Sequence, residues 1–330
     1  MQSIDTGTLE DLAVGATVLG TGGGGDPYLG KLMARQAIEQ HGPVRLVEPE
    51  ELPTDGLVLP VAMMGAPTVL VEKIPNGAEL EKVVRAVENR LGREAAALMS
   101  VEAGGINSTI PIVAAAELGL PLLDADGMGR AFPEIPQCSM SVRGISATPM
   151  ALSDEKGNLE LLETISNDWT ERLSRTATVA MGGSSIIALY PMTVEEAASA
   201  VIPRTMSRAV EIGWTIRVAQ SRGENALQAL LDLTSGRLLF RGKVADVMRR
   251  TVEGFARGTA TLEGTDKDSG STLELEFQNE HLVAMREGEP VASVPDLITV
   301  LDAESRIPVT TEGISYGQRV EVIGMPCAPI

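Results

Sequence analysis

Residues 96–125, AALMSVEAGGINSTIPIVAAAELGLPLLDA, decide the fold of this chain. Residues 96–101 form an apolar run of strand length, residues 108–118 read as a helix, and residues 120–125 form a second strand. Two strands joined by a helix are typical of a βαβ unit, in which the strands are parallel. This stretch therefore predicts a parallel sheet.

The same alternation occurs upstream. Residues 57–63 read as a buried strand and residues 79–91 as a helix. Apolar residues at helical spacing predict a further helix over 8–19, and a second helix runs to about residue 40. Asp26 is its expected N-cap and Pro27 its first residue. The first part of the chain therefore has the pattern of a three-layer α/β domain.

The second half changes character. A hairpin is expected over 145–165, with its turn at 156–158, and a helix starts near Asp168. Residues 193–233 read as helical, with interruptions at Pro203 and Gly223. Beyond Gly236, short β runs separated by turns predict a smaller β-rich domain, barrel- or sandwich-like. We expect two domains, an α/β domain over 1–235 and a β-rich domain over 236–330.

Composition excludes several kinds of partner. The 330 residues include 27 basic and 45 acidic side chains, which gives a net charge of −18. This charge repels nucleic acids and anionic membranes. No basic leader or membrane-spanning run is recognised, so a cytoplasmic location is expected. The two cysteines, Cys138 and Cys327, lie far apart and form neither a disulfide framework nor a zinc pattern. A homo-oligomer is expected only because many such enzymes assemble symmetrically.

The glycine-rich run at 20–27, GTGGGGDP, matches the dinucleotide fingerprint G-x-G-x-x-G at Gly20, Gly22 and Gly25. A helix precedes it where that fingerprint needs a strand, and the Asp26 carboxylate would occupy the helix amides that a phosphate needs. A flexible loop is one alternative. We favour a substrate-binding wall made of backbone, formed by Gly22, Gly23, Gly24, Gly25 and Asp26.

Polar residues follow the predicted strands in three segments, 63–67, 101–108 and 124–134. Ligands of open parallel sheets bind beyond the carboxyl ends of the strands. We therefore expect one crevice there. The residues expected around it are Glu102, Gly104, Gly105, Asn107, Asp124, Asp126, Arg130 and Glu134.

Asp124 and Asp126 are two residues apart, so both side chains point the same way in an extended segment. Two close carboxylates raise one pKa and can serve as an acid and a base. The alternative for Asp126 is a turn with Gly127 and no catalytic role, and a divalent metal such as Mg²⁺ or Mn²⁺ is a further alternative. No other cofactor is expected.

Asn107 is the expected N-cap of the helix at 108–118, and with the amides of Gly104 and Gly105 it could hold an oxyanion. Arg130 could bind a substrate carboxylate, or simply neutralise the acidic residues around it. His281 reads as a turn residue, and Cys138 as a buried thiol rather than a nucleophile.

Several long motifs together resemble one family, the S-methyl-thiohydantoin desulfurase-like family associated with hydantoinases and oxoprolinases. These motifs are VLGTGGGGDPYLG, VEAGGINSTIPI, PLLDADGMGRAFPE, LFRGKVADVMRRTVEGFARG, EFQNEHL, VPDLITVLD and YGQRVEVIG. The resemblance covers nearly the whole chain. It implies an α/β N-terminal domain, a β-rich C-terminal domain and a hydrolase that removes sulfur from a thiohydantoin-type ring. The family pattern has Asn where this chain has His281.

Residue chemistry completes the expectation of a hydrolase for a small cyclic substrate. Asp124 or Asp126 would activate water as the general base, and its partner or Glu102 would protonate the leaving group. Asn107 and the Gly104 and Gly105 amides would hold the tetrahedral intermediate. The alternatives are a hydrolase of another cyclic amide or imide, and a non-catalytic metabolite-binding or accessory protein of hydantoin metabolism.

Overall fold

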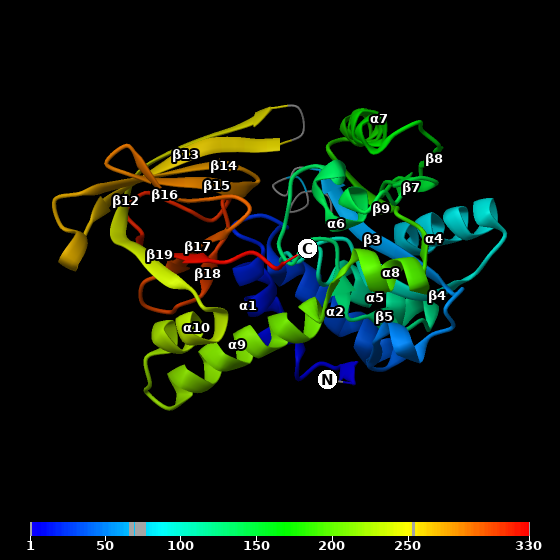
Figure 1. Ribbon diagram of the computed structural model, residues 1–330, viewed down its shortest axis with the longest axis horizontal. Helices are drawn as coiled ribbons and strands as arrows, with labels where there is room; N and C mark the ends of the chain where they lie inside the picture. Colours follow the sequence, from blue (N-terminus) through cyan, green and yellow to red (C-terminus); the bar gives the residue numbers. More distant parts are fainter. Residues whose placement is uncertain (1, 66–68, 70–76, 253–254, 330) are drawn as a thin grey trace.

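The computed structural model describes residues 2–65, 69, 77–252 and 255–329. Of the polar segment expected at 63–67, Ala66 and Pro67 lie outside these residues. The described chain forms two large sheets with a layer of helices between them (Figure 1).

The N-terminal sheet has nine strands in the order β1-β2-β5-β4-β3-β9-β7-β8, with β10 also paired to β3. Their bounds are β1 Ser3–Ile4, β2 Val44–Val47, β3 Leu57–Gly65, β4 Ala95–Ser100, β5 Leu122–Leu123, β7 Met150–Ser153, β8 Leu159–Leu162, β9 Ser184–Ala188 and β10 Met192–Thr193. Strands β2, β5, β4 and β3 are parallel, as the βαβ pattern predicted.

The sheet is not parallel throughout. Strand β9 pairs with β3 in the antiparallel direction, and β7 and β8 continue the antiparallel pairing beyond it. A short turn joins β7 to β8, and such a turn allows only antiparallel neighbours. The sheet is therefore mixed, with its parallel part at β2 to β3.

Helices cover both faces of this sheet and give three layers. On one face lie α1 (Leu9–Leu19), α2 (Pro27–His41), α4 (Ala78–Leu91) and α5 (Ile110–Leu118); on the other lie α6 (Ser139–Val142), α7 (Asn167–Ala180) and α8 (Val194–Ala200). Strand β3 alternates between the two cores, because Leu59 and Val61 join the first and Val58 and Ala62 the second. Its sequence is apolar throughout for this reason.

Two further helices connect the halves of the molecule. Helix α9 (Thr205–Ser221) packs on α1, and α10 (Ala226–Thr234) follows it. The two helices approach closely because Gly15 of α1 lies against the backbone of α9. A Cβ on Gly15 would lie 1.7 Å from the carbonyl oxygen of Ala209. The core around these helices also contains Leu297 and Ile323 of the second sheet.

The C-terminal sheet is antiparallel, in the order β16-β15-β14-β13-β12-β19-β17-β18. Its strands are β12 Arg237–Val252, β13 Phe255–Gly264, β14 Thr272–Gln278, β15 Glu280–Arg286, β16 Glu289–Ser293, β17 Leu297–Asp302, β18 Pro308–Val309 and β19 Arg319–Met325. The sheet bends over a core of its own that includes Phe240, Leu275 and Val300. The expected β-rich domain is confirmed; of its two expected forms, barrel-like or sandwich-like, the described strands do not form a closed barrel, because β16 and β18 are the ends of the sheet and no pairing joins them.

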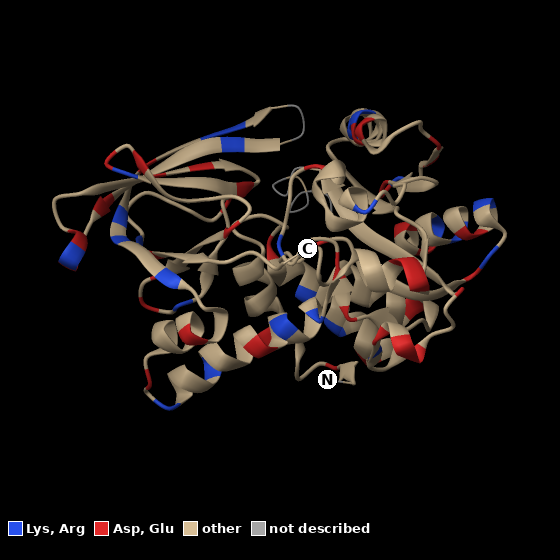
Figure 2. Cartoon of the chain, in the orientation of Figure 1, with Lys and Arg blue, Asp and Glu red and all other residues tan. Residues whose placement is uncertain are grey.

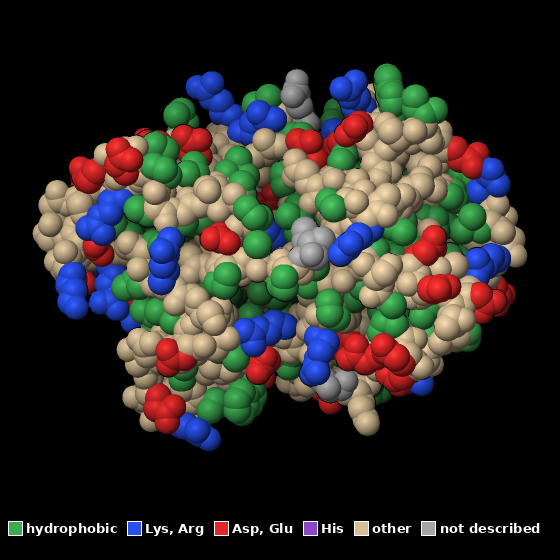
Figure 3. All heavy atoms as spheres, viewed as in Figure 1, with side chains coloured by type: hydrophobic (Ala, Val, Ile, Leu, Met, Phe, Trp, Pro, Cys, Tyr) green, Lys and Arg blue, Asp and Glu red, His purple; other side chains and the backbone are tan. Residues whose placement is uncertain are grey.

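Charged side chains are distributed over both halves (Figure 2), and on the face in Figure 3 acidic and basic groups alternate with apolar ones. None of the helices in the described ranges combines the length and apolar character needed to cross a membrane. The exclusion of nucleic acid and the homo-oligomeric state remain predictions.

Candidate active site

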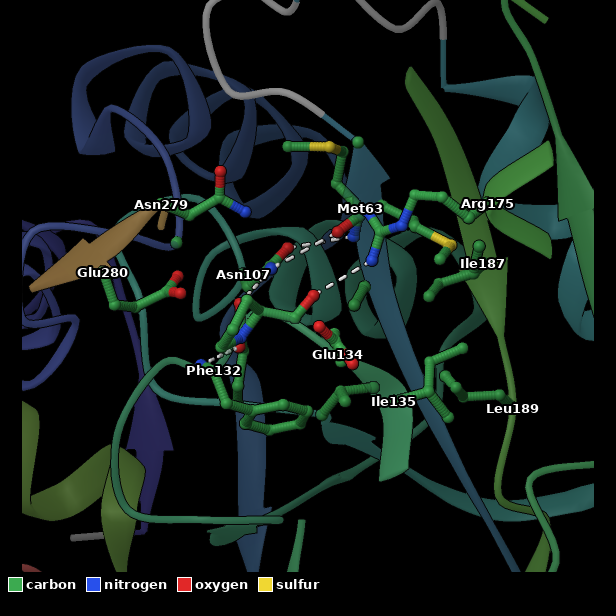
Figure 4. A pocket seen from close by; sticks show the side chains of 17 residues that line it. Met63, Asn107, Phe132, Glu134, Ile135, Arg175, Ile187, Leu189, Asn279 and Glu280 are labelled. Carbon is green, nitrogen blue, oxygen red and sulfur yellow. Dashed lines mark hydrogen bonds between the residues drawn. The ribbon is translucent and has the colours of Figure 1, made fainter. Parts of the chain in front are cut away.

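A pocket lies where the carboxyl end of β3 and the loop after β4 meet the β14–β15 turn of the C-terminal sheet. The residues that line it come from both halves of the chain (Figure 4). They are Gly24, Ala62, Met63, Met64, Gly65, Val101, Glu102, Asn107, Phe132, Pro133, Glu134, Ile135, Arg175, Ile187, Leu189, Asn279 and Glu280.

Glu102 is fixed at the base of this pocket by two hydrogen bonds. The Asn107 amide Nδ2 donates to one carboxylate oxygen at 2.6 Å, and the backbone amide of Phe132 donates to the other at 2.7 Å. Asn107 is itself held by β3, because its Oδ1 accepts a hydrogen bond from the Met63 amide at 2.9 Å. The orientation of Glu102 is therefore set before any ligand binds.

The expected N-cap role of Asn107 is wrong. Helix α5 starts two residues later than predicted, with Thr109 at the N-cap position and no side-chain cap. The Asn107 side chain is directed away from the helix end, toward β3 and Glu102. Its amide is thereby committed to positioning Glu102 rather than to holding an oxyanion.

Glu280 reaches the pocket from the C-terminal sheet. The preceding residue, Asn279, has a left-handed φ of 57°, and its Oδ1 accepts a hydrogen bond from the Ala256 amide at 2.9 Å. Asn tolerates this conformation better than most residues. The tight turn that results directs the Glu280 side chain into the pocket (Figure 4).

The two glycine-rich runs fit against each other and against this turn. A Cβ on Gly24 would lie 2.4 Å from the Cα of Gly104, and one on Gly105 would lie 2.2 Å from the carbonyl oxygen of Gly25. Gly23 faces the Glu280 carboxylate, and a Cβ there would lie 1.9 Å from its Oε1. The glycines therefore allow close approach of protein to protein, and Gly24 is the member of the first run that lines the pocket.

Burial sets the electrostatics of the two carboxylates. Desolvation raises the pKa of Glu102, although the Phe132 amide, Asn107 and the Arg130 charge oppose that rise. Desolvation raises the pKa of Glu280 well above its usual range, and the negative charge of Glu102 raises it further. Among the residues that the structure describes, none donates a hydrogen bond to the Oε2 of Glu280, so Glu280 retains its proton more readily than Glu102 does.

Arg130 lies behind the pocket and is 2% exposed. Its Nη1 donates to the carbonyl oxygens of Pro295 and Asp296, both at 2.8 Å, and its Nη2 donates to the Thr21 hydroxyl at 3.1 Å. Burial lowers its pKa, while the charges of Glu280 and Glu102 raise it. Of the two expected roles, this placement matches neutralisation of nearby acids, and Arg130 also links the two halves of the molecule.

The predicted aspartate pair is not brought to the pocket. The Asp124 carboxylate accepts hydrogen bonds from the backbone amide of Ser207, at 3.0 Å, and from its hydroxyl. It lies instead beside the ends of β2 and β5. Asp126 accepts from the amides of Met128 and Gly129 at 3.1 and 2.6 Å, which is the turn that was the alternative interpretation.

Asp126 is fully buried, and desolvation raises its pKa to about 7, against the amides that lower it. The charge of Glu102 adds to this rise, so the carboxylate that interacts with Asp126 is Glu102 rather than Asp124. Of the remaining predicted site residues, some line the pocket and others have a structural role elsewhere. Glu134 lines the pocket, whereas Asp26 caps α2 through the Tyr28 amide, at 2.7 Å.

Three polar residues of the pocket were absent from the predicted site: Arg175, Asn279 and Glu280. Asn279 and Glu280 occur in EFQNEHL, one of the motifs that carry the family resemblance. That motif was the feature of the sequence that could have indicated these two residues. His281, next in that motif, faces Gly22 rather than the pocket, and neither of its ring nitrogens has a hydrogen-bond partner among the described residues. Burial lowers its pKa to about 3, so the ring is neutral.

Cys138 is buried, as expected, and burial raises the pKa of its thiol. Within the described ranges, no group of three or more His, Cys, Asp or Glu side chains is arranged to hold a metal ion. The divalent-metal alternative remains a prediction, and the described residues offer no group of side chains that could bind the metal.

The fold and the pocket together define a two-part α/β protein in which acidic side chains from both halves of the chain line one pocket. The S-Me-THD-like N-terminal domain model matches residues 7–164, and the S-Me-THD-like C-terminal domain model matches residues 165–330. The chain therefore belongs to the S-Me-THD-like family, as its motifs indicated. These models divide the chain at 164/165, and the expected domain boundary at 235/236 remains a prediction.

A crystal structure of a protein from Chromobacterium violaceum, solved in a structural-genomics programme, has the same fold. The TM-score is 0.80 at 26% sequence identity, and the match covers 99% of this chain and 92% of that chain. No curated protein matches the chain.

Proposed function

We propose that this pocket is the active site of a hydrolase that removes a sulfur substituent from a small thiohydantoin-type ring. The observation that carries the proposal is the pair Glu102 and Glu280, two buried acidic side chains from the loop after β4 and from strand β15 that line one pocket. Two carboxylates with different environments are a common basis for acid and base roles at neutral pH. Membership of the S-Me-THD-like family supports the choice of substrate.

The environments assign the two roles. Burial raises the pKa of Glu102, but the Phe132 amide, Asn107 and Arg130 favour its ionised form, so of the two acids it is the one that takes a proton from water as the general base. The water oxygen attacks the ring carbon that carries sulfur, and the electrons of its carbon–nitrogen double bond move to the ring nitrogen, which takes the remaining proton of the attacking hydroxyl. The carbon–sulfur bond of the tetrahedral intermediate then breaks as the carbonyl forms, and protonated Glu280 gives its proton to the departing sulfur. The products are a hydantoin and a thiol, and the proton on Glu102 restores Glu280 through solvent.

Thiol release from S-methyl-thiohydantoins tests the proposal. Glu102→Gln and Glu280→Gln should each lower kcat by 100-fold or more, because acid–base groups contribute about 10²–10⁴ to the rate. Glu163→Gln is the control, since Glu163 forms an exposed ion pair with Arg90. A melting curve for each variant separates loss of chemistry from loss of folding.

Full activity in a folded Glu102→Gln variant would overturn this assignment. Binding of a hydantoin without any thiol release would favour the metabolite-binding alternative. Repeating the assay with a chelator tests the metal alternative, because loss of activity that added Mg²⁺ or Mn²⁺ restores would place a metal in the reaction.

A further inference from the structure

The pocket has two chemically different sides. Glu280 and Asn279 lie on one side and Ile135, Ile187 and Leu189 on the opposite side, with Asn107 and Glu134 between them (Figure 4). We name Met64, Ile135, Ile187 and Leu189 the apolar wall; all four are buried. A ligand that fills the pocket therefore meets polar acceptors at one end and aliphatic carbon at the other.

From this division we infer that the substrate ring carries an uncharged, aliphatic substituent that packs on the apolar wall. The inference rests on the proposed function and specifies its substrate class. The ring, with its polar N–H and C=O groups, would bind at the side of Glu280 and Asn279, because a protonated carboxyl group and an amide both donate and accept hydrogen bonds. An aliphatic group on the wall gains free energy by leaving water, whereas a charged group there loses its hydration.

Arg175 does not make the apolar side a site for an anion. Its Nε donates to Glu171 at 2.8 Å and its Nη2 donates to the Pro133 carbonyl oxygen at 3.0 Å. Its guanidinium also lies 4.2 Å from the ring centroid of Phe255. Glu171 compensates the charge of Arg175, so Arg175 offers no free cation to an acidic substituent of the ligand.

Binding of three hydantoins by calorimetry tests the inference without relying on turnover. The ligands are unsubstituted hydantoin, the 5-isobutyl derivative and the 5-carboxymethyl derivative. We expect the isobutyl compound to bind about tenfold or more tightly than unsubstituted hydantoin, the size of effect that added methylenes have in apolar pockets. We expect the carboxymethyl compound to bind more weakly than the unsubstituted one.

Adjacent residues of β9 provide matched variants. Ile187 lines the pocket, whereas Ile186 is equally buried but faces the core on the opposite side of the sheet. Ile187→Ala should reduce the preference for isobutyl over unsubstituted hydantoin by about fivefold or more, and Ile186→Ala should leave it unchanged. Both variants lose the same atoms, so general destabilisation affects them alike.

The results separate this inference from the proposed function. Two results would overturn the inferred substituent but leave the proposed function standing. One is binding and turnover of unsubstituted rings with no preference for the isobutyl group, and the other is tighter binding of the carboxymethyl compound. Equal loss of preference in both isoleucine variants would also overturn it. Failure of every hydantoin to bind, together with no thiol release, would overturn the proposed function itself.

Discussion

At the scale of single residues, the environment of each carboxylate matters more than its position in the sequence. Asp124 and Asp126 are close in sequence, yet the structure commits one to Ser207 and the other to a turn. Glu102 and Glu280 are far apart in sequence and line the same pocket. The sequence indicated that acidic residues follow the predicted strands. Which of these residues lie together in the pocket depends on contacts between segments far apart in the sequence.

Asp126 makes a pH-dependent contribution to stability that can be measured. Folding raises its pKa from 3.8 to about 7, mainly through burial, so the folded state holds this proton more tightly. The contribution is fully present below about pH 4 and is lost as the pH rises through about 7. Asp126→Asn removes it. The unfolding free energy of the wild type, relative to this variant, should therefore fall by a few kcal/mol between pH 4 and pH 7.5.

Urea unfolding at several pH values measures this difference. Asp154→Asn is the control: burial alone would raise the pKa of Asp154, but hydrogen bonds from Asn158 and Lys156 outweigh burial and lower it. Asp154 therefore titrates below the tested window. Its variant should run parallel to the wild type above pH 4.5, and parallel curves for Asp126→Asn would refute the prediction.

At the scale of elements, the loops after α1 and β4 act as one unit because their glycines are in backbone contact. The carbonyl oxygen of Gly24 accepts a hydrogen bond from the Ile106 amide at 2.7 Å. This contact places the Glu102 loop against the glycine run. The sequence predicted that both loops would lie near a site, but it could not predict that they lie against each other.

Gly24→Ala should disrupt this contact strongly. Gly24 has a φ of +74°, and its added Cβ would overlap the backbone of Gly104. Gly144 has a similar φ of +81° with nothing within 4 Å, so Gly144→Ala isolates the cost of the left-handed conformation. We expect that control to lose about 1–2 kcal/mol of unfolding free energy. Gly24→Ala should lose at least about 2 kcal/mol more and should weaken hydantoin binding.

Chemical denaturation of both variants, with calorimetry for binding, gives the comparison. Equal losses of unfolding free energy in the two variants, with unchanged binding, would mean that the two loops do not depend on their close contact.

At the scale of the whole molecule, local patterns predicted much of the architecture. The βαβ unit, the helices α1, α2 and α4, and the β-rich end follow from apolar periodicity, which is local. The antiparallel strand β9 and the insertion of the β14–β15 turn into the site depend on contacts between residues far apart in sequence. For that reason Glu280 was not predicted, although its motif was recognised.

Arg130 should matter to the stability of the whole molecule. It links Thr21 to Pro295 and Asp296 and lies in the field of two buried carboxylates. Arg130→Met leaves these carboxylates without their cation, and we expect a loss of about 3–5 kcal/mol of unfolding free energy. Arg90→Met breaks a solvent-exposed ion pair with Glu163 and should lose less than about 1 kcal/mol.

Urea unfolding of both arginine variants measures these losses. A loss for Arg130→Met no larger than that for Arg90→Met would show that the buried guanidinium does not stabilise the carboxylates around it.

The β14–β15 turn has a consequence for inheritance. Glu102 and Glu280 fall in different family domains, so a recombination event between them would take the two acidic residues from different parent genes. In such a hybrid the glycine run of one parent would have to fit the turn of the other, at the contact that Gly23 and Glu280 make in this chain. The two halves are therefore expected to diverge together, and transplanting a new specificity into this scaffold requires replacing the glycine run and the turn as a pair.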